Sequence, residues 1–222
     1  MLKRNKSLVI SILLIAIIMT IVVVANAASK WEMFGSSYWN INNDADKNKV
    51  IAKLNGEEIT KKEFEGKKVF LSTLNSKEPS PREIMEEIVS QKILIIEAKK
   101  LNLYPSRNET LAYMENIKSV KAEAKKEGIK IDEESEKSWQ EALKGQRMTE
   151  DEYWKSEDTI NRYQEALAIA KVRSKLAKDW GFSEDEMVTP DGIDKFEKEL
   201  DNMVNERKNN LKLEHLESGF TN

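Results

Sequence analysis

Apolar and polar residues are arranged in three different ways along this chain of 222 residues. An almost unbroken apolar run covers residues 8–25, and helical spacing of apolar side chains recurs from about residue 60 to residue 210. Short stretches with strand character flank that helical part at residues 50–54 and 211–216. These patterns predict a mainly α domain that follows an N-terminal membrane-type segment.

The apolar run follows three cations and is interrupted only by Ser11 and Thr20, which is typical of an export signal. Its length matches the roughly 18–20 residues that span a bilayer, which predicts an N-terminal membrane helix through residues 8–25. Ala25-Asn26-Ala27 also fits a signal-peptidase site, so residues 1–27 are either a retained anchor or a signal peptide cleaved after Ala27. The positive-inside rule places the rest outside the cytoplasm in both cases. We therefore expect a single-pass membrane protein with an external C-terminal domain, or a secreted one.

Residues 28–49 are rich in Asn, Asp, Ser and Gly and show neither helical nor strand periodicity, which predicts a linker. Trp31, Phe34, Tyr38 and Trp39 lie within it. Aromatic residues just beyond a membrane segment often lie at the bilayer interface. Packing of these rings against the folded domain is the other interpretation.

Helix starts are indicated by a repeated capping-box pattern, in which Ser or Thr is followed three residues later by Glu. The pattern begins at Thr60, Ser80, Ser106, Thr149 and Ser183. After the second of these, apolar residues from Ile84 to Leu101 cover much of a helix circumference. That distribution predicts a central helix contacted from several sides.

Val50 to Leu54 read as a strand that ends in an Asn55-Gly56 turn. A lone strand is not stable, so it needs a partner. Residues 57–60 are too short for a good return strand, whereas residues 211–216 alternate with period two. We therefore predict a small two-stranded sheet that joins the N- and C-terminal segments of a helical domain over residues 50–222.

Charge and composition exclude several classes of function. The chain has 36 Lys and Arg against 39 Asp and Glu; without the three N-terminal cations the balance is 33 − 39 = −6, so no nucleic-acid partner is expected. Cysteine is absent and His215 is the single histidine, which excludes the usual zinc and nucleophile-base sites within the chain. No Gly-rich phosphate loop or calcium loop occurs. We expect no enzyme activity, no cofactor and no metal.

Large apolar side chains on otherwise polar stretches are the remaining candidates for function. One interpretation is core packing, because aromatics at helical spacing usually point inward. The other is a groove for unfolded or extended polypeptide, because large and adaptable side chains suit promiscuous contact surfaces. The set comprises Trp180 and five predicted polypeptide-binding residues, Trp139, Met148, Tyr153, Trp154 and Tyr163.

Two segments resemble a known family. "VIAKLNGEEITKKEF" followed by "PREIMEEIVSQKILIIEAKKLNL" resembles the N-terminal module of SurA/PrsA-type extracytoplasmic chaperones over residues 50–103. The resemblance implies a mostly helical module whose terminal segments pack together and which holds exported proteins while they fold. The chain departs from the family by leaving no room for a parvulin-type isomerase domain and by lacking the lipoprotein cysteine of PrsA proteins.

Two functions of different kinds are therefore predicted. The first is an ATP-independent extracytoplasmic chaperone, or holdase, that binds unfolded exported polypeptides. The alternative is a membrane-anchored interaction module that binds one specific envelope protein and has no chaperone activity. The range of polypeptides bound would distinguish them.

Overall fold

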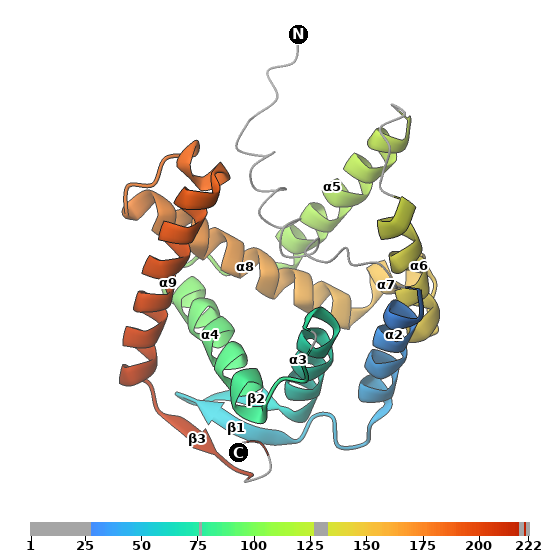
Figure 1. Cartoon of the computed structure of the whole chain (residues 1–222), viewed down its shortest axis with the longest axis horizontal. Helices are drawn as coiled ribbons and strands as arrows, with labels where there is room; N and C mark the ends of the chain where they lie inside the picture. Colours follow the sequence, from blue (N-terminus) through green and yellow to red (C-terminus); the bar gives the residue numbers. More distant parts are fainter. Residues whose placement is uncertain (1–27, 76, 127–132, 218–219, 221–222) are drawn as a thin grey trace.

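The computed structural model describes residues 28–75, 77–126, 133–217 and 220 (Figure 1). The predicted signal or anchor in residues 1–27, including its cleavage site, lies outside the described residues. The described part contains eight α-helices, one short 3₁₀ helix and three strands. The prediction of a mainly α fold is confirmed.

The elements follow one another in an order that places the strands at both ends of the helical body. They are α2 (Ala28–Asn43), β1 (Val50–Leu54), β2 (Glu57–Thr60), α3 (Lys61–Leu74), α4 (Pro81–Lys100), α5 (Arg107–Lys126), α6 (Glu133–Gln146), α7 (Glu150–Lys155), α8 (Glu157–Asp179), η1 (Glu186–Val188), α9 (Pro190–Asn210) and β3 (Leu213–His215).

The sheet has the strand order β2-β1-β3, with both pairings antiparallel. Leu54 lies opposite Leu213, so the predicted pairing of the two terminal segments is confirmed. The prediction of only two strands was wrong, because Glu57–Thr60 forms β2. Asn55 and Gly56 both have positive φ, and this tight turn returns the chain directly beside β1. Even four residues can then pair, and Ile59 is fully buried opposite Ala52.

The predicted linker over residues 28–49 is also corrected, because most of it forms α2. This helix packs against α6 at two glycines. A Cβ atom on Gly35 would collide with the carbonyl oxygen of Ala142, and one on Gly145 would collide with that of Glu32. The backbones therefore approach more closely than larger side chains would allow. The Arg147 guanidinium lies 3.8 Å from the centre of the Trp39 ring and adds a cation–π contact beside this crossing.

Capping explains most of the helix starts. Thr60, Ser80 and Thr149 form complete capping boxes, as predicted. Ser183 forms the same reciprocal bonds with Glu186 ahead of η1. Ser106 forms only half a box, because its Oγ accepts the Glu109 N–H while the Glu109 carboxylate pairs with Lys171 on α8.

One hydrophobic core lies between the sheet and helices α3, α4, α8 and α9 (Figure 1). The predicted central helix α4 contributes buried side chains along most of its length, and α9 contributes Phe196, Leu200 and Val204. Phe220, near the C-terminus, contacts Phe64 on α3 with ring centroids 4.8 Å apart. Both ends of the domain thus pack against the same core.

A second, smaller core lies where α5, α6, α7 and α8 meet. Its buried residues are Met114, Leu143, Tyr153, Ile160 and Tyr163. The helix α8 therefore belongs to both cores, since its Ala168 and Val172 lie in the larger one. Among the described helices, none has the length and apolar character that crossing a bilayer requires.

Candidate polypeptide-binding site

The five predicted polypeptide-binding residues come together on three helices and one turn of the second core. Trp139 lies on α6, Met148 in the turn after it, Tyr153 and Trp154 on α7, and Tyr163 on α8. We call these five residues the aromatic cluster. Sequence spacing alone could not show this convergence, because it depends on how α6 folds back against α7 and α8.

Two caps fix the geometry of the short helix at the centre of the cluster. Thr149 opens α7 with a capping box to Glu152, and Ser156 ends α7 while its side chain accepts the Thr159 N–H that opens α8. Six helical residues are too few to be stable alone. The caps and the packing of Tyr153 therefore set the direction in which Trp154 points.

The rings of the cluster touch edge to face or tilted, as aromatic pairs prefer. Trp139 and Tyr153 meet with centroids 4.7 Å apart at an interplanar angle of 86°. Trp154 lies 5.6 Å from Tyr153 and 5.6 Å from Tyr163. The four rings therefore form one contiguous apolar unit.

Burial divides the cluster into two layers. Tyr153 and Tyr163 are 8% and 6% exposed and form the inner layer. Trp139, Met148 and Trp154 are half-buried, pack against that layer and form the outer layer. Core packing therefore describes the two tyrosines, while the outer layer also presents apolar surface to solvent.

The polar atoms of the two tryptophans differ in their partners. Trp154 Nε1 donates a hydrogen bond of 3.2 Å to the Glu150 carboxylate. Trp139 Nε1 is buried and has no acceptor among the described residues, which is uncommon for an indole N–H. The outer layer therefore contains one unpaired donor.

The tyrosines of this region are held in the neutral form. Burial raises the pKa of the Tyr153 and Tyr163 hydroxyls, and burial raises the pKa of Tyr113 on α5 to about 12. The Arg162 guanidinium lies 5.9 Å from the Tyr153 ring centre. Because burial raises the pKa of all three tyrosine hydroxyls, these tyrosines are neutral at pH 7 and their rings carry no charge.

Trp180 does not join the cluster. It follows α8, is 36% exposed and lies 5.6 Å from Phe196 between ring centroids. It is therefore a natural control for the effect of a solvent-exposed tryptophan elsewhere on the molecule.

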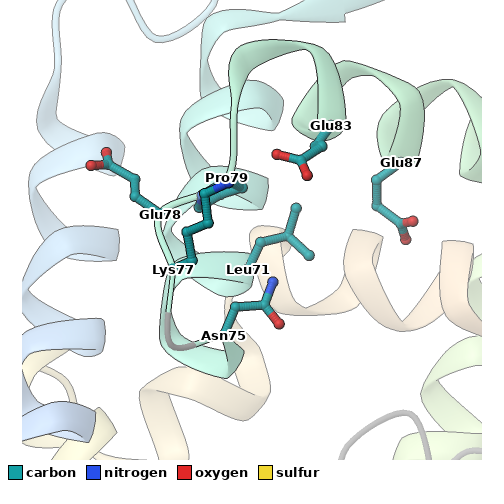
Figure 2. Close-up of a pocket in the computed structure, with 7 residues that line it drawn as sticks. All are labelled: Leu71, Asn75, Lys77, Glu78, Pro79, Glu83 and Glu87. Carbon is teal, nitrogen blue, oxygen red and sulfur yellow. The ribbon is translucent and has the colours of Figure 1, made fainter.

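Two concave pockets in the described part of the chain lie away from the cluster. One of about 240 Å³ is bounded by the end of α3 and the start of α4, where Figure 2 shows Leu71 among polar side chains and Glu78 pointing away from them. The other, of about 220 Å³, lies between α4 and α9 and includes Ile93, Ile96 and Leu211. Neither of these two pockets contains a residue of the aromatic cluster.

Sequence reasoning missed a group of half-buried charges between α3, α4 and α8. Burial raises the pKa of Glu165 on α8, although Lys92, Lys99 and Lys67 oppose that shift. Burial lowers the pKa of Lys67. The same effect would lower the pKa of Lys92, but Glu63, whose carboxylate lies 2.5 Å from the ammonium, reverses it. No pattern in the sequence indicates this group, because charged residues occur on every helix.

Among residues 28–75, 77–126, 133–217 and 220 there is no group of three metal-ligating side chains. Comparison with protein-family models, curated proteins and solved structures finds no match to this chain. The resemblance to SurA/PrsA-type modules consequently stays a prediction.

Proposed function

We propose that this chain is an extracytoplasmic, ATP-independent holdase that binds apolar segments of unfolded exported polypeptides on its aromatic cluster. Residues 8–25 would hold it at the outer face of the cell membrane. The observation that carries the proposal is the outer layer of the cluster, in which Trp139, Met148 and Trp154 are half-buried above a buried layer of tyrosines.

A fixed apolar surface of this kind suits the chemistry of an unfolded client. Apolar side chains of a client gain free energy when they leave water, and this gain does not depend on their order in the sequence. The thioether of Met148 is flexible and polarizable, so it adapts to side chains of different shape.

The buried tyrosines supply rigidity. Because Tyr153 and Tyr163 already pack inside the domain, their burial stabilises the fold and not the complex. The outer tryptophans then contact the client without first having to be ordered, which lowers the entropic cost of binding.

The test is suppression of client aggregation by the full chain in mild detergent, with reduced, carboxymethylated and chemically denatured proteins as clients. Trp139→Ala and Trp154→Ala together should reduce protection at least several-fold at a temperature at which the melting curve shows the variant to be folded. Trp180→Ala is the matched control and should protect as the wild type does.

Two results would contradict the proposal. If a folded wild-type chain protects none of several unrelated clients, holdase activity is absent. If the double variant protects as well as the wild type, clients bind elsewhere than on the aromatic cluster. A melting curve for each variant separates loss of binding from loss of folding.

A further inference from the structure

The strand β3 is the outer strand of the sheet, at the bottom of Figure 1. The Asn55 N–H donates to the Lys212 carbonyl oxygen at 2.8 Å, and the Leu216 N–H donates to the Ile51 carbonyl oxygen at 2.9 Å. In an antiparallel ladder, hydrogen-bonded residues alternate along each strand. Residues 212, 214 and 216 therefore face β1, while the backbone N–H and C=O groups of Leu213 and His215 face outward.

No described element pairs with this outward edge. Leu211 is already extended, with φ −108° and ψ 143°, so the extended stretch begins before β3. Glu214 and His215 are exposed and Leu216 is 52% exposed. An exposed edge is commonly protected by a proline, a bulge, charged side chains or a short strand. Residues 211–216 contain no proline, so β3 is protected by its three-residue length and by the charges of Lys212 and Glu214.

We propose that two copies of this chain associate through this edge, with β3 of one copy antiparallel to β3 of the other and Leu213 at the centre. The outward-facing residues must pair with each other, which limits the possible registers. In a symmetric dimer, the two-fold axis can then pass either between the two copies of Leu213 or between the two copies of Glu214. The two choices differ in the charges that they bring together.

Centring on Leu213 places Lys212 of each copy opposite Glu214 of the other, which gives two pairs of opposite charge. Centring on Glu214 places the two Glu214 carboxylates directly opposite each other, and like charges in that position are destabilising. Lys212 and Glu214 have exposed side chains that reach each other at 2.7 Å within one chain, so both can also turn toward a second copy.

The Leu213-centred register also agrees with the hydrogen bonds already present. Leu213 of the two copies would exchange N–H and C=O bonds, and each His215 N–H would reach the Leu211 carbonyl oxygen of the other copy. The Leu211 N–H is already bonded to the Lys208 carbonyl oxygen, so the pairing ends where the strand does. The three-stranded sheets would join into one continuous sheet across the two-fold axis.

This self-complementary charge pattern favours a second copy over a client strand, because a client would have no fixed charge opposite Lys212 and Glu214. The edge is short, so we expect a weak dimer in equilibrium with the monomer, and the fraction of dimer should rise with protein concentration. The inference is independent of the proposed holdase function.

Charge swaps test the register directly. The full-length chain with two different epitope tags is purified in mild detergent, and association is measured by co-purification and by sedimentation. We expect the wild type to dimerise and Lys212→Glu alone or Glu214→Lys alone to weaken dimerisation at least tenfold. Mixing these two variants should restore association as a heterodimer, since each lysine then faces a glutamate of the other copy. The double variant should also dimerise.

A covalent readout complements the charge swaps. Because the chain has no cysteine, Leu213→Cys should give a disulfide-linked dimer on a non-reducing gel, whereas Glu214→Cys should give much less. A wild type that stays monomeric at millimolar concentration would overturn the proposal, and so would single charge variants that dimerise normally. If the wild type is monomeric and Glu214→Lys instead weakens client capture, the edge takes a client strand and the dimer is wrong.

Discussion

At the scale of single residues, the most unusual feature is a half-buried carboxylate that lies among lysines. Glu165 of α8 lies near Lys67, Lys92 and Lys99, but each of these lysines has a carboxylate partner of its own, Glu87, Glu63 and Glu57 respectively. The loss of water around Glu165 therefore outweighs the attraction of the lysines, and its pKa is raised. The fold tolerates this group at a cost in stability.

We expect Glu165→Gln to stabilise the protein at neutral pH by about 1 kcal/mol, an ordinary scale for a single-site effect. A carboxyl group whose pKa is raised in the folded state makes its full favourable contribution to folding at pH values below its pKa in the unfolded state. This contribution is lost as the pH rises through the folded pKa. The advantage of the Gln variant should thus be large at pH 7 and vanish near pH 4. Urea unfolding at several pH values measures it.

The exposed Glu199 on α9 provides the control. Glu199→Gln should leave the free energy of unfolding almost unchanged across the same pH range. A Glu165→Gln variant that is less stable than the wild type at pH 7 would show that the lysines, and not burial, decide the charge state of this residue.

At the scale of elements, the sequence predicted the helices and strands whose ends are determined by neighbouring residues along the chain. The capping boxes at Thr60, Ser80 and Thr149 identified three helix starts, and period-two alternation identified β3. The helix α2 was missed because its stability comes from contact with α6, which the sequence shows only as two distant glycines, Gly35 and Gly145. The strand β2 was missed because its pairing depends on the turn at Asn55 and Gly56 and not on its own length.

The α2–α6 crossing gives a test of that account. Gly35→Ala should lower the free energy of unfolding by roughly 2 kcal/mol or more, because the added methyl group meets the Ala142 carbonyl oxygen. Gly66→Ala on α3 is the matched control, since its Cβ would lie 3.5 Å from the Tyr38 hydroxyl in ordinary contact. The control should be as stable as the wild type, or more stable by up to about 1 kcal/mol. Equal stability of both variants would contradict the close crossing.

The sheet gives a second test at this scale. The Glu214 N–H faces β1, whereas the His215 N–H faces outward, so proline at the two positions should have different effects. We expect Glu214→Pro to lower the melting temperature by several degrees, in line with a loss of about 1 kcal/mol or more. His215→Pro should leave the fold intact while it removes the proposed association of two copies. Equal melting temperatures for the two variants would mean that the register of β3 is wrong.

At the scale of the whole molecule, two cores share α8, and both ends of the described chain are fastened to the body. The sequence predicted the larger core through α4 and its closure by β3. It also identified the members of the aromatic cluster, but it could not divide them into a buried and a half-buried layer. That division depends on the angle at which α6 meets α7 and α8, and no pattern within one helix reports such an angle.

The central claim is that unfolded polypeptide contacts the outer layer of the aromatic cluster. Its most direct test is photo-crosslinking of the full chain, which is free of native cysteine, after Met148→Cys and labelling with a benzophenone maleimide. A matched label at Asn209→Cys on α9 marks an exposed surface outside the cluster. We predict that the label at position 148 captures a reduced, carboxymethylated client in low and high salt and does not capture the same client in its native form, and that the label at position 209 captures neither. Equal capture from both positions, or capture that disappears as salt is raised, would contradict the account.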